Sequence, residues 1–345
     1  MNINGRTLSP HHPPFIVAEV AQTHEGSLGL AMSFIRVAKQ CGAHAIKFQT
    51  HIADAESTPH EPWRVPFSQQ DSSRHAYWKR MEFTFEQWQQ LRKCADDCDI
   101  IFLSSPFSIE ACHWLQRLEM PAWKIASGEM HNPELLAWVR NTGQPVILST
   151  GLSTAETIDK QVDFFRSGGC DVALLHCTTE YPTPPETAGL NLLSELQNTY
   201  PHLAVGLSDH SGQPYAGILA AYLGASLIEV HLTLHPQMFG PDVSSSLTPE
   251  QLAFLVRGTE AAWRMRSHPV LRDQHSATQA PGRRIFGRSW YTTRPLPAGH
   301  VLQKEDMAYK KPGGGMEYDA LDSLLGKTLL NPLPAHHPLF PDDIN

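Results

Sequence analysis

The chain has 345 residues, with 27 Lys and Arg against 35 Asp and Glu and a formal net charge of −8. This length fits one large domain of roughly 250 residues with a smaller domain attached. The acidic balance argues against nucleic-acid binding, which needs clustered Lys and Arg, and no window approaches the ~20 apolar residues of a membrane span.

The amino-terminal segment, Met1–Pro14, lacks the apolar stretch and the small-residue cleavage site of a secretory signal. The six cysteines include no C-x-x-C pair, so a disulfide framework or a zinc knuckle is not indicated. Both observations favour a cytoplasmic protein with free thiols.

Short apolar runs alternate with stretches of helical periodicity along residues 1–266. Eight of these runs are predicted as β-strands: Phe15–Val20, Ala45–Thr50, Ile100–Phe107, Trp123–Glu129, Pro145–Gly151, Val172–Thr178, Ala204–His210 and Leu227–Leu234. Helices are predicted after them, at Leu28–Cys41, Thr84–Asp97, Ile109–Leu118, Pro133–Asn141, Ala155–Ser167, Leu190–Thr199, Tyr215–Leu223 and Pro249–Met265. This alternation predicts an α/β fold, a (β/α)8 or TIM barrel of parallel strands, with an open doubly wound sheet as the alternative.

Two segments interrupt the pattern. Ile52–Met81 is polar and aromatic without clear periodicity, and we predict a loop over the catalytic face of the barrel. Residues 267–282 lose the apolar period and are predicted as a linker. Residues 283–345 then form a small second domain, which has too few residues for a large core and is expected to lean on the barrel or on a partner subunit.

Polar residues follow the predicted strands at the end where a (β/α)8 barrel carries its catalytic groups. Because residues i and i+2 of a strand share a face, four pairs are expected to point into one cavity: Lys47 with Gln49, Ser127 with Glu129, Ser208 with His210, and Glu229 with His231. Lys124 has the opposite parity to Ser127 and joins the cavity only if the backbone is irregular near Gly128.

His210 and His231 stand at the ends of the seventh and eighth predicted strands, which are neighbours in a barrel. Two imidazoles so placed can share one divalent ion. A core histidine with satisfied hydrogen bonds is the alternative for either residue alone, but their matched positions favour a metal site. With oxygen ligands and water completing the coordination, Mn²⁺ fits well, and Zn²⁺, Co²⁺, Fe²⁺ and Mg²⁺ stay open.

Cations and hydroxyl groups at the strand ends predict a site for a small anion. The contributing residues are Lys47, Lys124, Ser127, Ser149, Thr179 and Ser208. No P-loop and no G-x-G-x-x-G motif follows a strand, so the anion is expected to be a small phosphate ester and not a nucleotide. A helix cap is the alternative role for each Ser or Thr.

Taken in order, the strand-end segments make seven motifs: Phe15–Glu19 with His24–Gly26, Ile46–Thr50, Lys124–Glu129, Leu148–Gly151, Leu175–Thr178 with Tyr181–Pro184, Gly206–His210, and Glu229 with His231 and Thr233. A Gly-Pro-Asp triplet follows at Gly240–Asp242. This set resembles the N-acetylneuraminate (sialic acid) synthase family, with its legionaminate, pseudaminate and spore-coat polysaccharide relatives. The resemblance covers nearly the whole chain.

The resemblance implies a metal-dependent transferase that joins phosphoenolpyruvate to an open-chain N-acyl-hexosamine such as N-acetylmannosamine. In that scheme the metal polarises the aldehyde, C3 of phosphoenolpyruvate attacks it, water adds at C2, and phosphate leaves by C–O cleavage. The metal ligands would be His210 and His231, and phosphoenolpyruvate would contact Lys47, Lys124, Ser127, Ser149 and Ser208. The residues that would contact the sugar or a metal-bound water are Glu19, Gln49, Tyr181 and Asp242. The catalytic residues would be Glu19, Glu129 and His231, with Glu129 against the reacting carbons.

The carboxyl-terminal segment resembles the antifreeze-like (SAF) domain of these synthases, on the residues Arg284, Ser289, Gly299, Lys311–Gly315 and Leu325–Lys327. In the family this domain reaches over the barrel of a second subunit. The resemblance therefore implies a domain-swapped homodimer in which Lys311 meets the acceptor sugar of the partner.

Four residues depart from the family pattern: Thr23 and Thr179 where Asn is usual, Val230 where Arg or Lys is usual, and Lys311 where Arg is frequent. Lysine lacks the planar fork of arginine, so the acceptor can differ from N-acetylmannosamine itself. Two other functions stay open. One is a phosphoenolpyruvate–aldose condensation of the 3-deoxy-ulosonate type, and the other is a non-catalytic carbohydrate-binding protein on the same fold.

Overall fold

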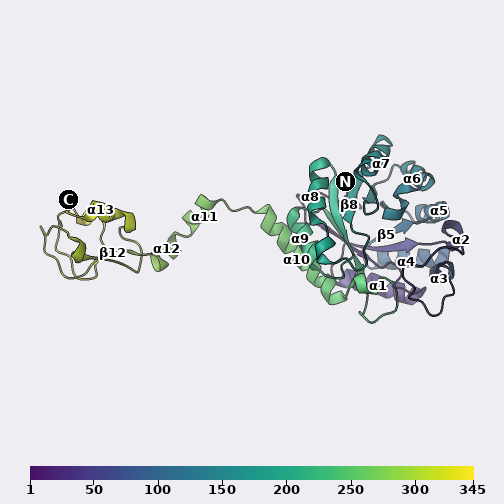
Figure 1. The fold of residues 1–345 in the computed structure, drawn as a ribbon, viewed down its shortest axis with the longest axis horizontal. Helices are drawn as coiled ribbons and strands as arrows, with labels where there is room; N and C mark the ends of the chain where they lie inside the picture. The colour runs from purple at the N-terminus through teal and green to yellow at the C-terminus, as the bar shows by residue number, and fades with distance from the viewer. The chain divides into compact units, whose positions relative to one another are not determined.

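The computed structural model describes all residues from Met1 to Asn345 and divides into two compact units, Met1–His268 and Pro269–Asn345 (Figure 1). None of the helices combines the length and the apolar character that crossing a bilayer requires. Each unit has its own hydrophobic core.

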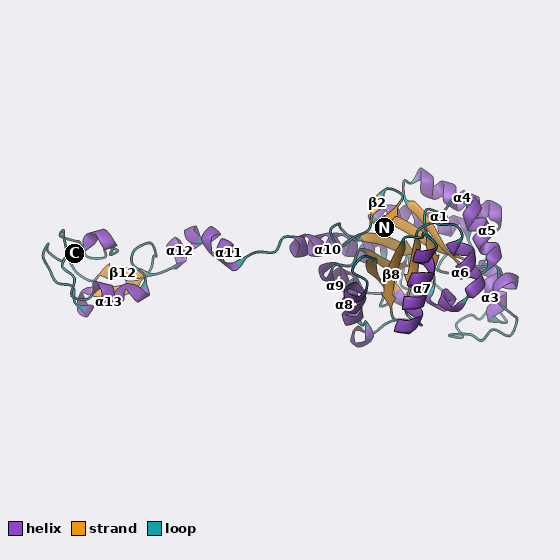
Figure 2. Cartoon of the chain, turned by 90° about the horizontal axis from the view of Figure 1, so that it is seen from above, coloured by secondary structure: helices purple, strands orange, loops and turns teal.

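The first unit is a barrel of eight parallel strands surrounded by helices (Figure 2). The strands are β3 (Phe15–Glu19), β4 (Ala45–Thr50), β5 (Ile101–Pro106), β6 (Trp123–Ile125), β7 (Val146–Ser149), β8 (Val172–Cys177), β9 (Ala204–Asp209) and β10 (Leu227–Leu232). Hydrogen bonds join them in the order β5-β4-β3-β10-β9-β8-β7-β6, and β11 (Ser246–Leu247) pairs with the end of β10. Strands β5 and β6 lie side by side at the remaining seam. The predicted (β/α)8 barrel is therefore confirmed.

The helices of the barrel begin where the sequence offers a cap. They are α1 (Leu28–Gln40), α4 (Phe85–Asp97), α5 (Ile109–Arg117), α6 (Pro133–Arg140), α7 (Ala155–Ser167), α8 (Leu190–Thr199), α9 (Tyr215–Leu223) and α10 (Pro249–Ser267). Ser or Thr side chains accept a backbone N–H at the starts of α1, α4, α5, α7 and α10, and Asn132 does so at α6. Such a cap typically contributes ~1 kcal/mol to helix stability.

Aromatic side chains fill the space between the sheet and the helices. Phe48 on β4, Phe102 on β5 and Trp88 on α4 are almost completely buried, with ring centroids 5.6 to 6.4 Å apart. The contact of Trp88 with both Phe rings is edge to face, the arrangement that aromatic pairs favour. This packing fixes β4, which carries Lys47 and Gln49 at its carboxyl end.

The fourth strand is shorter than predicted. Strand β6 stops at Ile125, and Ser127–His131 form a 3-10 helix, η1. The expectation that Ser127 and Glu129 share a strand face is therefore wrong, because the backbone turns after Ala126, whose carbonyl accepts the N–H of Glu129 at 2.9 Å. The same irregularity lets Lys124 and Ser127 reach one site despite their opposite parity.

Two segments without a clear sequence period nevertheless contain helices. Ile52–Met81, predicted as a loop, carries α2 (Ala53–Glu56) and α3 (Arg74–Met81), the latter capped by Ser73. Residues 267–282, predicted as a linker, carry α11 (Arg272–Thr278) and the start of α12 (Ala280–Phe286). These helices are short and have few buried residues, so the sequence shows no apolar periodicity that would predict them.

The second unit folds around a small core of its own. Strands β12 (Ser289–Thr292) and β13 (Met307–Lys310) pair antiparallel, and α13 (Leu321–Leu324) packs beside them. The buried residues are Trp290, Leu296, Leu302, Met307, Leu324, Leu329, Leu333 and Leu339.

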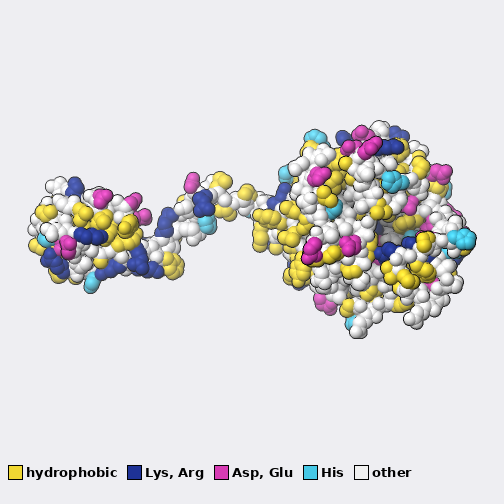
Figure 3. Space-filling view, viewed as in Figure 1, with side chains coloured by type: hydrophobic (Ala, Val, Ile, Leu, Met, Phe, Trp, Pro, Cys, Tyr) yellow, Lys and Arg dark blue, Asp and Glu magenta, His cyan; other side chains and the backbone are white.

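Large apolar side chains are exposed on α9 and on part of α10 (Figure 3). Tyr215, Leu219 and Tyr222 on α9 are 64%, 54% and 54% exposed, and Phe254 on α10 is 49% exposed. Helix α9 contains no charged residue. Exposed apolar surface of this kind marks a contact with another molecule more often than it is left to solvent.

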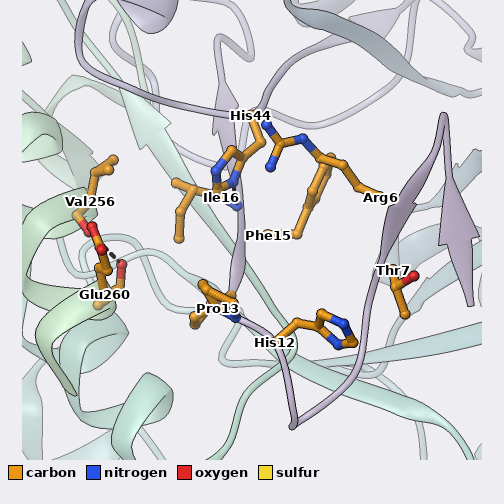
Figure 4. A pocket seen from close by; sticks show the side chains of 11 residues that line it. Arg6, Thr7, His12, Pro13, Phe15, Ile16, His44, Val256 and Glu260 are labelled. Atoms are coloured by element: carbon orange, nitrogen blue, oxygen red, sulfur yellow. Dashed lines mark hydrogen bonds between the residues drawn. The ribbon is translucent and has the colours of Figure 1, made fainter. Parts of the chain in front are cut away.

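A hollow of about 400 Å³ lies at the amino-terminal ends of the barrel strands (Figure 4). Its walls include Arg6, Phe15 and Ile16 at the start of β3, and His44, whose Nδ1 accepts the Ile16 N–H at 2.9 Å. None of the predicted site residues lines it, because those residues lie at the opposite ends of the strands.

Candidate active site

Four charged side chains meet inside the carboxyl-terminal end of the barrel. Lys47 Nζ lies 2.5 Å from Glu19 Oε2 and 3.6 Å from Glu229 Oε1, and Lys124 Nζ also lies 3.6 Å from Glu229 Oε1. All four side chains are at most 6% exposed. The strand register explains the meeting, since Glu19 is opposite Lys47 on β4 and β10 runs beside β3.

The two lysines do not have equivalent surroundings. Burial opposes the charged form of Lys47, yet the carboxylates of Glu19 and Glu229 outweigh it and raise the Lys47 pKa. Burial lowers the pKa of Lys124, whose ion-pair partner is Glu229. Burial also opposes the charged form of Glu229, but Lys124 and Lys47 outweigh it and lower the Glu229 pKa to about 2. This carboxylate therefore holds two buried ammonium groups in place.

Two of the predicted serines contact this charged cluster. Lys124 Nζ donates to Ser149 Oγ at 2.7 Å, and Ser208 Oγ donates to Glu229 Oε1 at 3.2 Å. Ser127 Oγ accepts the N–H of Gly151 at 3.2 Å and lies 3.0 Å from Cys177 Sγ. Two ammonium groups and several hydroxyls in a water-poor site suit a phosphate or a carboxylate.

The predicted metal ligands lie together. The ring centroids of His210 and His231 are 5.2 Å apart, and both side chains are buried. His210 Nδ1 lies 2.8 Å from the carbonyl of Thr178 and donates to it, so its Nε2 keeps a lone pair and accepts from Tyr181 OH at 3.1 Å. His231 Nδ1 is buried without a hydrogen-bond partner.

These features fit a divalent ion. Burial and the neighbouring His231 lower the pKa of His210 to about 3, so its imidazole is neutral at physiological pH, as a metal ligand must be. No third His, Cys, Asp or Glu completes a protein-only cluster. The two imidazoles would therefore hold an ion whose other ligands are water or substrate oxygens.

Tyr181 and Asp242 lie beside the histidine pair at the barrel mouth. The Tyr181 ring stacks on His210 with centroids 4.2 Å apart. The Arg64 guanidinium covers that ring at 4.3 Å and donates to Asp242 Oδ1 at 2.6 Å. Thr179 is exposed nearby, with its Cγ2 close to Gly151.

Glu129 lies on η1, and Lys311 belongs to the second unit. Glu129 Oε2 accepts from Asn132 Nδ2 at 2.8 Å, and burial raises the Glu129 pKa while the nearby charge of Glu56 adds to that effect. Lys311 is exposed on the unit Pro269–Asn345.

The structure brings together most of the predicted residues and adds three that the sequence left without a role, His51, Glu56 and Arg64. Glu229 was expected to point into the cavity with His231, and the structure places it against both lysines. His51 could have been found, because it stands two residues after Gln49. Arg64 and Glu56 lie in the segment without periodicity, and no signal in the sequence marks them.

Comparisons with known proteins identify the family of the chain. Residues 34–270 match the NeuB family, and residues 287–345 match the SAF domain. The N-acetylneuraminate-9-phosphate synthase of Homo sapiens is 30% identical over 335 residues, which cover 94% of this chain and 91% of the human protein. The N,N'-diacetyllegionaminic acid synthase of Campylobacter jejuni is 29% identical, covering 90% of this chain and 94% of that protein. The solved N-acetylneuraminic acid synthetase of Leptospira borgpetersenii superposes with a TM-score of 0.72 at 29% identity, covering 82% of this chain and 95% of that one.

Proposed function

The chain belongs to the NeuB family and is a synthase of the sialic-acid type, and from that premise we propose that it condenses phosphoenolpyruvate with an open-chain N-acyl-hexosamine. The observation that carries the proposal is the buried cluster of Lys47, Lys124 and Glu229 next to the histidine pair. In this proposal an anion site and a candidate metal site lie in the same barrel mouth. The first suits the anionic enol ester, the second suits the aldehyde, and their reaction needs both substrates side by side.

Phosphoenolpyruvate is assigned to the cationic side of the site. Lys47 and Lys124 supply charge, and Ser127, Ser149 and Ser208 supply hydroxyl groups. Because these donors are already arranged around buried charges, they stabilise the phosphate as it leaves without reorganising solvent.

The acceptor sugar is assigned to the side of Glu19, Gln49, Tyr181 and Asp242. In the proposed reaction a carbon–carbon bond forms between C3 of phosphoenolpyruvate and C1 of the aldehyde. Water adds to C2, and the C2–O bond to phosphate breaks, so that one aldehyde, one phosphoenolpyruvate and one water give a nonulosonate and phosphate. Glu129, whose pKa is raised by burial, is assigned to proton transfer near the reacting carbons.

His210 and His231 would hold the metal, with Mn²⁺ as the proposed ion. A divalent cation held there would act as a Lewis acid towards the aldehyde oxygen. The role of the protein is to keep both imidazoles neutral and oriented. The Thr178 carbonyl fixes the His210 tautomer, as hydrogen-bonded partners do for metal-ligating histidines.

We further propose that the enzyme is a homodimer in which Lys311 contacts the acceptor of the partner subunit. The apolar surface of α9 and α10 supports association with a second copy of the chain. Lysine offers a point charge with rotatable donors where arginine would give a planar contact, so the preferred acceptor is a relative of N-acetylmannosamine.

A panel of aldehydes tests this function. The protein is incubated with Mn²⁺, phosphoenolpyruvate and either N-acetylmannosamine, its 6-phosphate, 2,4-diacetamido hexoses or simple aldose phosphates, and phosphate release is followed. Release with an N-acyl-hexosamine supports the proposal. Release only with simple aldose phosphates would support a 3-deoxy-ulosonate synthase, and sugar binding without release would support a carbohydrate-binding protein.

A further inference from the structure

His51 lies outside every motif but is built into the site. Its ring is held between Trp78 and Phe107, with centroids 4.2 and 4.3 Å away and interplanar angles of 18° and 19°. Its side chain is 5% exposed. Trp78 comes from α3 and Phe107 follows β5, so two separate elements fix the plane of this imidazole.

Both ring nitrogens of His51 have polar partners. Nε2 lies 3.1 Å from Gln49 Oε1, and Nδ1 lies 2.6 Å from Glu56 Oε1. Glu56 ends the one-turn helix α2, and its Oε2 accepts the N–H of Ile52. The side chain of Glu56 is only 8% exposed, so this carboxylate has few other partners.

The hydrogen-bond pattern decides how the Gln49 amide is oriented. Gln49 Nε2 donates to Glu19 Oε1 at 2.9 Å, and a carboxylate can only accept. Gln49 Oε1 must then accept, and it does so from His51 Nε2 and, at 3.3 Å, from Gln22 Nε2. His51 therefore donates from Nε2 to Gln49, and its Nδ1 stays in hydrogen-bond contact with Glu56.

One continuous row of contacts follows from these bonds. It runs from Glu56 through His51, Gln49 and Glu19 to Lys47, at distances of 2.6, 3.1, 2.9 and 2.5 Å. Without the His51 donor the Gln49 oxygen keeps only the longer contact with Gln22, at 3.3 Å, so the amide can rotate away from Glu19. The charges of Glu56 and His51 also act on Glu129, which places the pair near the other proposed catalytic carboxyl group.

We propose that His51 and Glu56 are positioning residues that fix the Gln49 amide, and through it Glu19, for the acceptor sugar. This inference rests on the proposed function. It adds a specific division of roles, because His51 contacts Gln49 directly and Glu19 through Gln49, both on the acceptor side. Of the residues assigned to phosphoenolpyruvate the row meets only Lys47, at its far end, and it does not include Lys124, Ser149 or Ser208. Loss of His51 should therefore affect the acceptor far more than phosphoenolpyruvate.

His51→Phe tests the proposal, because phenylalanine keeps a flat ring between Trp78 and Phe107 and removes both hydrogen bonds. An unsatisfied buried polar group costs about 1–3 kcal/mol, so we expect kcat/KM for the acceptor to fall roughly 10- to 100-fold. The KM for phosphoenolpyruvate should change less than about twofold. Glu56→Leu, which removes only the outer carboxylate, should give the same selectivity with a smaller loss.

His75→Phe is the matched control. His75 Nε2 lies 3.2 Å from Asp54 Oδ1, so it also ties a histidine to a carboxylate of α2, but it has no link to Gln49. We expect its kinetics to match the wild type. Equal acceptor losses in His51→Phe and His75→Phe would overturn the proposal, because both would then act only by holding α2.

A double variant and a crystal structure complete the test. If His51 acts through Gln49, then His51→Phe combined with Gln49→Ala should be no worse than Gln49→Ala alone. Additive losses would contradict this. A crystal structure of His51→Phe tests the positioning role without any activity assay. We expect the Gln49 amide to move away from Glu19, and an unchanged Gln49–Glu19 contact at 2.9 Å would overturn the proposal. This result counts even if the wild-type protein proves inactive and the proposed function is refuted.

Discussion

Replacing Glu229 by Gln tests the charge balance of the site directly. The Glu229 carboxylate contacts both Lys47 and Lys124, and its side chain is 6% exposed. The change keeps the shape of the side chain and removes the negative charge. Two buried ammonium groups would then share only Glu19, which reaches Lys47 alone.

The size of the effect follows from the pKa of Glu229. Burial opposes its charge, but Lys124 and Lys47 lower the pKa from 4.5 to about 2, a difference worth about 3 kcal/mol. Because the pKa is lowered on folding, this stabilisation is fully present above about pH 4.5 and disappears as the pH falls towards 2. At neutral pH the variant should therefore lose about 3 kcal/mol, or roughly 6–12 °C in Tm for a domain of this size.

Phosphoenolpyruvate should reverse much of this loss, because its phosphate and carboxylate bring negative charge to the same lysines. In thermal unfolding at pH 7, we expect saturating phosphoenolpyruvate to raise the Tm of Glu229→Gln by more than it raises the Tm of the wild type. Asp71→Asn is the control, since Asp71 pairs with Arg80 in the same unit and contacts neither Lys47 nor Lys124. Equal ligand shifts in all three proteins would refute the assignment of the lysines to phosphoenolpyruvate.

Three further changes probe other parts of the site. Glu129→Gln should lower kcat far more than it weakens phosphoenolpyruvate binding. Because burial raises the Glu129 pKa, the kcat/KM of the wild type should fall with decreasing pH through a pKa above the usual carboxyl range. This decrease at acidic pH should be absent in the variant. His210→Ala should abolish both Mn²⁺ binding, measured by electron paramagnetic resonance, and chelator-sensitive activity, and retained tight binding would remove His210 from the metal site. Lys311→Arg should shift the ratio of kcat/KM values towards N-acetylmannosamine with the phosphoenolpyruvate KM unchanged, and an unchanged ratio would exclude Lys311 from acceptor choice.

The barrel could be predicted from the sequence because its parallel strands are buried on both faces. Such strands form continuous apolar runs, and the polar residues that follow them mark the carboxyl ends. The pairing of His210 with His231 follows from the same regularity, since neighbouring strand ends must meet. The break after Ile125 could not be predicted, because a 3-10 turn has no period that separates it from a strand end.

The contacts of the segment between β4 and α4 were also beyond sequence reasoning. Arg64 reaches Tyr181 and Asp242, which lie more than one hundred residues away along the chain. The role of Glu56 depends on one turn of helix placing its carboxylate against His51. Contacts of this kind are set by tertiary packing and leave no local pattern in the sequence.

The most direct measurement follows the carbon that changes its bonding. Phosphoenolpyruvate labelled with ¹³C at C3 is mixed with the enzyme, Mn²⁺ and an N-acyl-hexosamine, and ¹³C NMR and phosphate release are recorded together. We expect the vinyl CH₂ signal to be replaced by that of a methylene bonded to a sugar carbon, with one phosphate released for each product formed. Phosphate release that leaves the label in pyruvate, or a product that retains the phosphoenolpyruvate phosphate, would contradict the proposed condensation.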